Sequence, residues 1–493
     1  MRGMTTATSA SVETVPEPPS QGGVLSGPYR ALTLGIVSVV LLLAFEATAV
    51  NTAMPEAARQ LDGLGLYAFA YSGYFTSTLF ALVVSGQWSD RRGPMGPLFT
   101  GIAVFGAGLV LAGAATNMWM FLAGRVVQGL GGGLVIVALY VVVGRAFPER
   151  LRPAVFAAFS AAWVLPSILG PLISGAVTQH LGWRWVFLAV PVLILLPLVV
   201  MGPALRRSER AERAGRAEQG QPSRRGAEFD LRRTGLAAMA AVGAALLQYA
   251  GQRRDLPGLV PAVVGAALLG PAVLRLLPAG ALRVARGLPT VIVLRGVAAG
   301  AFFTAELFIP LMMVTQRHLS LTMAGLTLTS GGLSWALGSW LQGRPAADRH
   351  REALIRLGFL LTAVSIAGAA LVLIPAVPVW VAAVSWAVGG VGMGLAVASI
   401  SVLMMKLSKP EEAGVNSASL QLSDALGNVA LAGLAGVLFA ALGGGSVAAT
   451  GAAATAAATA TQAGVPVAPF ALIFAVMTGV ALLGAALTGR VKS

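Results

Sequence analysis

The chain has 493 residues, of which 56% are hydrophobic and 11% are charged, and its formal net charge is +15. A soluble domain carries about 25% charged residues, so these charges are too few to cover a water-facing surface, and we expect an integral membrane protein. The absence of cysteine excludes disulfides, a thiolate nucleophile and a cysteine metal site, and the three histidines, His180, His318 and His350, are too far apart in the sequence to suggest a metal cluster.

Fourteen apolar segments follow one another along the chain, each close to the roughly 20 residues that a helix needs to cross a bilayer. The first six cover residues 31–55, 67–88, 97–115, 117–144, 154–180 and 183–203. After a polar stretch, two more cover 234–251 and 256–277, and the last six cover 288–315, 321–342, 353–374, 377–404, 415–442 and 467–488. Lipid-facing barrel strands alternate in polarity and these segments do not, so we predict an all-α membrane protein.

The basic residues predict the orientation. An even number of spans places both termini on one side, and most of the 34 Lys and Arg fall on that side. The exceptions are Arg125 and Arg295 within spans and, on the opposite side, Arg59, Arg184, Arg253, Arg254 and Arg317. Because positively charged loops stay in the cytoplasm, we predict a multi-pass protein of the plasma or inner membrane with both termini cytoplasmic. The same scatter argues against a nucleic-acid partner.

Three segments outside the spans are polar or of low complexity. Residues 1–29 predict a disordered tail, and they lack the pattern of a secretory signal peptide. Residues 206–233 form a charged linker that we expect to be partly helical, and 443–464 form a low-complexity loop to which we assign no function.

Two motifs occur in the first half of the chain. GQWSDRRGP begins at Gly86 and joins the second and third spans. We expect Gly86 to permit a close helix approach, Asp90 to cap a helix or pair across the bundle, and Arg91, with Gly93 two residues later, to hold the loop on the cytoplasmic side. GRVVQGLGGG follows in the fourth span, where its arginine and glutamine are three residues apart and share a helix face; these are Arg125 and Gln128.

Two further stretches contain prolines and small residues. SILGPLISG, in the fifth span, contains Gly170, Pro171 and Gly175. FEATAVNTAMP, at 45–55, ends the first span and contains Glu46 and Asn51. Small residues commonly line helix contacts in membranes, and the GLGGG run lacks the spacing and the preceding strand of a nucleotide-binding loop.

Together these stretches resemble the motifs of the major facilitator superfamily. GQWSDRRGP is similar to its G-x-x-x-D-R-x-G-R-R/K signature, with Pro94 and Met95 in place of the final basic pair. GRVVQG is similar to R-x-x-Q-G, and SILGPLISG to the antiporter motif G-P-x-x-G-G, with Pro166 and Ser174 in place of expected glycines. FEATAVNTAMP and WRWVF, at 183–187, resemble motifs of the fourteen-helix drug:proton antiporters.

The resemblance implies the major facilitator fold, with two six-helix halves plus two inserted helices. The corresponding boundaries are a disordered cytoplasmic tail, an N-terminal half, a cytoplasmic linker, the inserted pair and a C-terminal half, at 1–29, 30–203, 204–233, 234–277 and 278–493. The halves of such transporters are related by an axis along the membrane normal.

Three acidic residues lie inside predicted spans: Glu46, Glu306 and Asp424. A charge at the bilayer centre costs about 2.5–3.5 kcal/mol on insertion scales, so each requires an explanation. Each could have a purely structural role: it could pair with Arg125 or Arg295, make a polar interhelical contact or lie near the interface. A structural role is expected most for Asp424. Glu46 and Glu306 lie at similar depth in the first helix of each half, where the resemblance places a central cavity.

We therefore expect these acids to couple transport to protons, and Glu46→Gln to leave the protein folded but without active efflux. The resemblance implies a monomeric, proton-coupled exporter of amphipathic small molecules, such as drugs or toxic metabolites, which would confer antibiotic resistance. The proton gradient would be its energy source and no cofactor is expected. A substrate cavity would be lined by Asn51, Phe302, Phe303 and Trp335, with Phe308 and Trp340 as further candidates, although lipid contact is the alternative for each aromatic residue.

Other functions remain open at this point. A lipid exporter of the same fold and an importer are the alternatives within transport. An enzyme is not expected, because the sequence has no GxSxG motif, no cysteine and no paired acid and histidine site. A receptor is disfavoured because the linker is too short for a signalling domain.

Overall fold

The computed structural model describes residues 23–148, 151–218, 230–251, 259–278, 280–281, 283–344, 349–408, 413–443 and 465–491. Within these residues the chain forms long α-helices and contains no strand, which confirms the all-α prediction. The long helices are α1 (Gly27–Gln60), α2 (Tyr67–Arg92), α3 (Met95–Gly113), α4 (Met118–Ala146), α5 (Arg152–His180), α6 (Arg184–Glu218), α7 (Leu231–Gly251), α8 (Leu259–Leu276), α9 (Leu288–Arg317), α10 (Leu321–Gln342), α11 (Arg351–Ala370), α12 (Trp380–Leu407), α13 (Ala413–Ala441) and α15 (Val467–Leu487).

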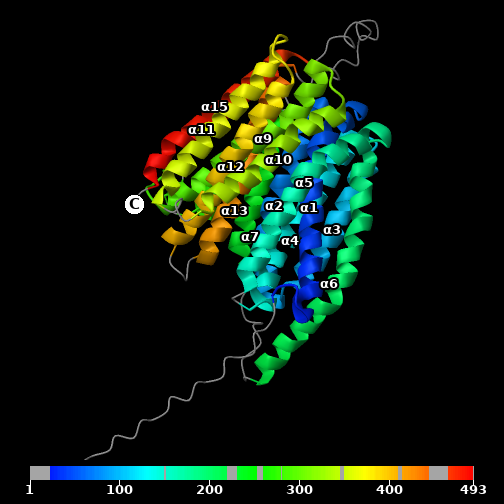
Figure 1. Ribbon diagram of the computed structural model, residues 1–493, viewed down its shortest axis with the longest axis vertical. Helices are drawn as coiled ribbons and strands as arrows, with labels where there is room; N and C mark the ends of the chain where they lie inside the picture. Colours follow the sequence, from blue (N-terminus) through cyan, green and yellow to red (C-terminus); the bar gives the residue numbers. More distant parts are fainter. Residues whose placement is uncertain are drawn as a thin grey trace, which may run out of the picture.

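These helices match the fourteen predicted segments in order, and three short 3-10 turns, Leu64–Leu66, Leu371–Leu373 and Thr488–Arg490, complete them. Eleven of the helices are long and apolar enough to cross a membrane, and α5, α7 and α10 are not among those eleven. Part of the predicted linker is helical, because α6 continues to Glu218 and extends past its neighbours in Figure 1. Residues 1–22, 219–229 and 444–464, which include most of the predicted tail and loop, lie outside the described residues.

Local sequence explains where several helices begin and end. Asn117 precedes α4, and its side-chain oxygen accepts a hydrogen bond from the backbone N–H of Met120 at 2.9 Å. This satisfies one of the unpaired donors of a helix N-terminus. At the other kind of boundary, Gly93 ends α2 with φ of 89°, a conformation that a glycine adopts without steric cost.

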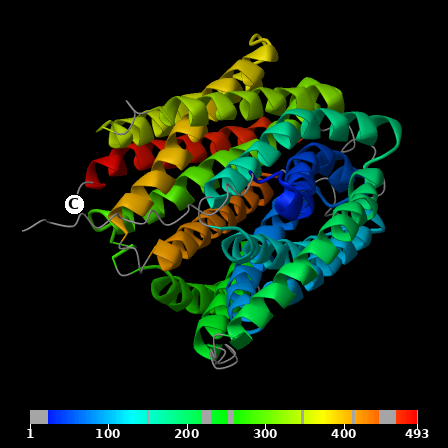
Figure 2. The same ribbon diagram turned by 60° about the horizontal axis from the view of Figure 1, so that its bottom comes forward.

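The helices of the first and second halves pack in the same pattern. In the first half α1 contacts α5 and α6, and α4 contacts α2 and α3, while α3 also contacts α6. In the second half α9 contacts α13 and α15, and α12 contacts α10 and α11, while α11 also contacts α15. Figures 1 and 2 show the two sets side by side, with blue and cyan helices on one side and yellow and red helices on the other.

The two sets meet along α5 with α10, α2 with α13, and α1 with α9. The first helices of the two halves meet each other, and the fifth helix of each half meets the second helix of the other, as expected for a two-fold relation. Helices α7 and α8 pack against each other, and α7 also packs against α2 and α13. The predicted residue boundaries of the halves stay a prediction.

The GLGGG run lets α4 pack tightly against two neighbours. A Cβ on Gly129 would lie 2.2 Å from the carbonyl oxygen of Tyr74 in α2, and one on Gly131 would lie 2.2 Å from the backbone nitrogen of Phe105 in α3. Real Cβ atoms do not approach other atoms so closely, so larger residues at these positions would force the helices apart. The run is therefore a packing surface that brings α4 close to α2 and α3.

Candidate functional site

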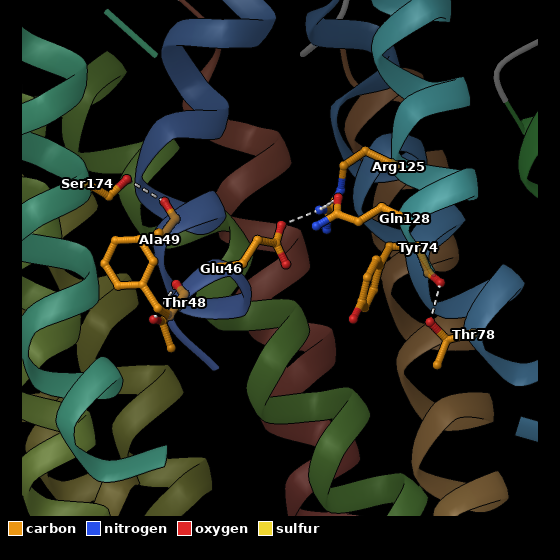
Figure 3. Close-up of polar contacts among 9 residues, drawn as sticks. Glu46, Thr48, Ala49, Tyr74, Thr78, Arg125, Gln128 and Ser174 are labelled. Carbon is orange, nitrogen blue, oxygen red and sulfur yellow. Dashed lines mark hydrogen bonds and ion pairs between the residues drawn. The ribbon is translucent and has the colours of Figure 1, made fainter. Parts of the chain in front are cut away.

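Glu46 and Arg125 form a buried ion pair between α1 and α4. Arg125 donates from Nη1 to Oε1 of Glu46 at 2.6 Å, and the two side chains are 3% and 1% exposed, in that order. Figure 3 shows Arg125 and Gln128 extending from α4 toward Glu46. Because each charge compensates the other, both groups can stay ionised where a lone charge would be costly. Pairing with Arg125 was one of the arrangements expected for this acid.

The ion pair continues into a small polar network. Nη1 of Arg125 also donates to Oε1 of Gln128, one helical turn later, and its guanidinium carbon lies 4.7 Å from the ring centroid of Tyr74 in α2. Three buried atoms of the network, Oε2 of Glu46, Nε of Arg125 and Nε2 of Gln128, lack a hydrogen-bond partner among the described residues. Each unpaired polar atom is costly in a buried network, so these three atoms are the least stable part of this arrangement.

Glu306 has a different environment from Glu46. It lies on α9 and accepts a hydrogen bond at 3.3 Å from Nδ2 of Asn51 on α1, so this contact joins the two halves. Among the described residues, Glu306 has no ion pair with a basic side chain. Its partner is an amide, which can donate to an ionised carboxylate and can accept from a protonated one.

Asp424 is paired within the second half. Arg295 on α9 donates from Nε to Oδ1 of Asp424 on α13 at 2.5 Å, and Nδ2 of Asn428 lies 3.4 Å from the other carboxylate oxygen. The two charged side chains are 18% and 20% exposed, so this pair is less enclosed than Glu46 with Arg125. Pairing with Arg295 was among the arrangements expected for an acid inside a span.

The charges inside the bundle therefore do not cancel. Arg125 and Arg295 are each paired to one acid, and the third acid, Glu306, has a neutral partner among the described residues. An unpaired carboxylate in a membrane costs several kcal/mol more than its protonated form. Glu306 is thus the acid of the three for which a change of protonation is least opposed by a fixed positive charge.

Aromatic side chains from three helices of the second half form one cluster. Two of them, Phe302 and Phe303, lie on α9 about one helical turn before Glu306. Phe302 stacks on Trp386 of α12 with ring centroids 4.5 Å apart, and Phe303 stacks on Trp335 of α10 at 6.1 Å. Phe302 also contacts Trp335 edge to face at 5.8 Å. We call Phe302, Phe303, Trp335 and Trp386 the aromatic cluster.

The other two aromatic candidates lie elsewhere. Phe308 is fully buried against Tyr67 of α2, with ring centroids 5.8 Å apart. Trp340 is 59% exposed and its ring lies 3.9 Å from the guanidinium carbon of Arg344, so it matches the alternative of an interfacial or lipid-facing aromatic. That Trp340 lines a cavity stays a prediction.

A family model of the Major Facilitator Superfamily matches residues 36–432, which is most of the chain. The chain belongs to the Major Facilitator Superfamily. This family is one of transporters, which favours the expected transporter over an enzyme.

Individual relatives match a smaller region. The chain is 36% identical to MFS transporter L2 of Phoma sp. over 161 residues, which cover 32% of this chain and 27% of that protein. It is 30% identical to Multidrug transporter protein MdtP of Bacillus subtilis over 156 residues, which cover 32% of this chain and 29% of that protein. The matched region thus spans less than a third of these relatives.

The solved structures extend the similarity over the whole fold. The crystal structure of an auto-inhibited POT family peptide transporter superposes with a TM-score of 0.62 at 16% identity, covering 93% of this chain and 98% of the other. At that identity the likeness shows the fold alone.

The superfamily motif in α5 lies where the two halves touch. Ser174 donates to the carbonyl oxygen of Ala49 in α1 at 2.6 Å (Figure 3). A Cβ on Gly170 would lie 2.3 Å from Oγ1 of Thr48, and one on Gly175 would lie 2.7 Å from the backbone of Thr322 in α10. The small residues of this motif thus hold α5 tightly between α1 of its own half and α10 of the other.

Pro171, the proline of the same motif, contributes to this contact through its backbone. A Cβ on Gly325 of α10 would lie 2.4 Å from the carbonyl oxygen of Pro171. Glycine is therefore required on both helices of the pair.

The superfamily motif between α2 and α3 differs from our expectation in part. A Cβ on Gly86 would meet nothing within 4 Å, so the expected close approach is wrong for this conformation. Asp90 is exposed, and among the described residues its side chain makes no hydrogen bond or ion pair. The end of α2 is held instead by Arg145 of α4, which donates to the carbonyl oxygen of Ser89 at 2.9 Å. Arg91 is exposed beside Asp90, and Gly93 makes the turn.

Tyr74 and Trp386 were not among the predicted site residues, although both contact residues that were. Tyr74 lies against Arg125, and Trp386 lies against Phe302. An aromatic residue in an apolar helix carries no local signal of its neighbours, so these two residues could not be found from spacing alone.

Proposed function

We propose that this transporter is a proton-coupled exporter of amphipathic small molecules that works by alternating access. The observation that carries the proposal is the contact of Glu306 with Asn51, because this partly buried acid joins the two halves and has a neutral partner. The multidrug transporter name of one relative supports export of such substrates. Fourteen helices and the FEATAVNTAMP stretch support placement in the fourteen-helix drug:proton antiporter family.

Glu306 is the proposed proton carrier. Enclosed between α1 and α9, the carboxyl group favours the neutral form because no positive charge compensates an ionised one. When the halves separate and water reaches the carboxyl group, hydration lowers the free energy of the ionised form and the proton is released. Asn51 can hydrogen-bond to either form, so the contact between the halves survives both protonation states.

Glu46 and Asp424 are proposed to assist as ionised groups. Each is bonded to an arginine, so protonating either acid leaves a buried cation without its partner. In this proposal Glu46 loses Arg125 when a proton or a cationic substrate competes for the carboxylate, and Arg125 then keeps only its contacts with Gln128 and Tyr74. The ion pair would thus couple substrate binding to protonation within the first half.

Phe303 and Trp335, the partly exposed members of the aromatic cluster, are the proposed surface for the apolar part of the substrate, and the buried Phe302 and Trp386 support them from behind. Stacked rings offer a broad, polarisable face with few hydrogen-bond requirements, which suits planar or amphipathic molecules of varied shape. Asn51, near the boundary of the two halves, would supply a polar contact. Together these groups favour a transporter of low selectivity.

The test is proton-driven transport of a fluorescent lipophilic cation in everted vesicles, with parent protein, Glu306→Gln and the control Glu56→Gln. Glu56 is bonded to Arg59 near the end of α1 and lies outside the polar network. We expect Glu306→Gln to abolish accumulation against a gradient and to leave counterflow exchange that no longer depends on pH, while the control behaves as the parent. Normal accumulation by Glu306→Gln would reject Glu306 as the proton carrier.

A further inference from the structure

Helix α7, the first of the inserted pair, lies along the boundary between the two halves. It packs against α2 of the first half and α13 of the second. Gln87 of α2 donates to Oγ1 of Thr234, near the start of α7, at 3.0 Å. Near the end of α7, Ser72 of α2 donates to Oε1 of Gln248 at 2.7 Å. Helix α7 is thus bonded to α2 at two levels about four helical turns apart.

The second of these levels also reaches the other half. Nε2 of Gln248 donates to the carbonyl oxygen of Val429 in α13 at 3.4 Å. The side chain is 5% exposed, and a Cβ on Gly433 would lie 3.0 Å from its Cγ, so a glycine makes room for it on α13. The amide of Gln248 therefore bonds with its oxygen to one half and with its nitrogen to the other.

This bridge lies at the end of the bundle where α1 ends and α2 begins, which we call the Tyr67 end. The halves are in direct contact there: Tyr67 donates to the carbonyl oxygen of Leu307 in α9 at 2.9 Å, and Thr322 of α10 donates to Gln179 of α5 at 2.9 Å. The described conformation is therefore closed at this end. Opening it requires α2 and α13 to move apart, and Gln248 could then keep only one of its two partners.

We infer that α7 acts as a strap, in which Gln248 stabilises the conformation closed at the Tyr67 end. The inference rests on the alternating access of the proposed function but not on proton coupling or on any substrate. Interhelical hydrogen bonds in membranes average about 0.6 kcal/mol. Losing the bridge should therefore raise the ratio of open to closed molecules by about threefold or more.

The test uses the natural absence of cysteine, which lets spin labels be placed at two new cysteines without background. Leu181 follows α5 and Leu442 follows α13, both exposed at the Tyr67 end and in opposite halves. Pulsed electron paramagnetic resonance in nanodiscs, without substrate or gradient, would give the distance distribution. We expect Gln248→Leu to increase the long-distance population about threefold, and Ser72→Ala to shift it less in the same direction.

The matched control is Gln87→Leu, which removes the bond between α2 and α7 that does not involve the second half. Its distance distribution should equal that of the parent. An unchanged distribution in both Gln248→Leu and Ser72→Ala, or an equal shift in Gln87→Leu, would overturn the inference and leave α7 as passive packing. Ser72→Ala keeps the test valid if Gln248→Leu is not monodisperse. Failure of the Glu306 experiment would not alter these distances, so the two proposals fail separately.

Discussion

At the scale of single residues, the decisive feature is that the three acids within the helices have unequal partners. Glu46 and Asp424 are bonded to arginines, and Glu306 is bonded to an amide. A fixed positive charge resists protonation of its partner, whereas an amide is indifferent to it. This difference separates acids that a sequence alone treats as equivalent.

One consequence corrects our expectation for Glu46→Gln. The substitution was expected to leave the protein folded, because an amide is cheaper to bury than a charge. In the structure it removes the partner of Arg125, whose side chain is 3% exposed. Breaking a buried pair from one side is destabilising by about 3–5 kcal/mol, because the remaining charge is uncompensated.

We therefore expect Glu46→Gln to lower the midpoint of thermal unfolding in detergent clearly more than Glu306→Gln, which strands no charge. The double variant Glu46→Gln with Arg125→Met should recover much of the loss. Fluorescence-detected thermal unfolding of purified protein measures all three. Equal midpoints for the two single variants would show that the ion pair contributes little to stability.

At the scale of helices, glycines determine how close two elements come, and two glycines in superfamily motifs differ sharply. A Cβ on Gly175 would lie 2.7 Å from the backbone of Thr322, while a Cβ on Gly86 would meet nothing within 4 Å. Backbone atoms cannot move aside as a flexible side chain can. The same substitution should therefore impair helix packing at Gly175 and leave it unchanged at Gly86.

We expect Gly175→Ala to push α5 away from α10 and to reduce transport severalfold. Gly86→Ala should be neutral in this conformation, and alanine is favoured over glycine in a helix by about 1 kcal/mol. Transport rates normalised to the amount of protein in the membrane would compare the pair. A larger loss for Gly86→Ala than for Gly175→Ala would mean that α2 makes its close contact in the other conformation and that α5 does not depend on this one.

At the scale of the whole molecule, the packing pattern repeats between the halves, and the bundle is closed at the Tyr67 end. The distribution of Lys and Arg predicts that this end faces outward, because few basic residues lie here and most lie toward the opposite end, where α1 begins and α15 ends. The closed end would then separate the site from the outside.

Orientation can be tested with epitope tags at Ser493 and within residues 443–464. We expect the first tag to be labelled only after the cytoplasmic side is permeabilised, and the second to be labelled in intact cells. An exposed tag inserted after Asp62, between α1 and α2, serves as a control and should behave like the second tag. Labelling of both principal tags from the same side would contradict the predicted number of spans.

The sequence alone was sufficient for the number, order and approximate bounds of the helices and for the superfamily. Long apolar segments have few alternatives in a membrane, because every backbone polar group must be bonded within the segment. Motifs such as GRVVQG and GPLISG consist of consecutive residues, so they can be recognised from the sequence alone. The pairing of Glu46 with Arg125 was also among the expected arrangements, since few charges were available.

Only the tertiary structure decided which acid has no charged partner, which aromatic residues meet and what the inserted helix touches. Asn51 and Glu306, or Ser72, Gln248 and Val429, lie on different helices, and their contacts depend on the rotation and depth of each helix in the bundle. The sequence of a hydrophobic segment determines neither its rotation nor its depth, because lipid and protein interiors are similarly apolar. The rotation and depth of each helix are determined by the packing of small residues where two helices come close. That packing depends on both helices, so the sequence of one segment does not reveal it.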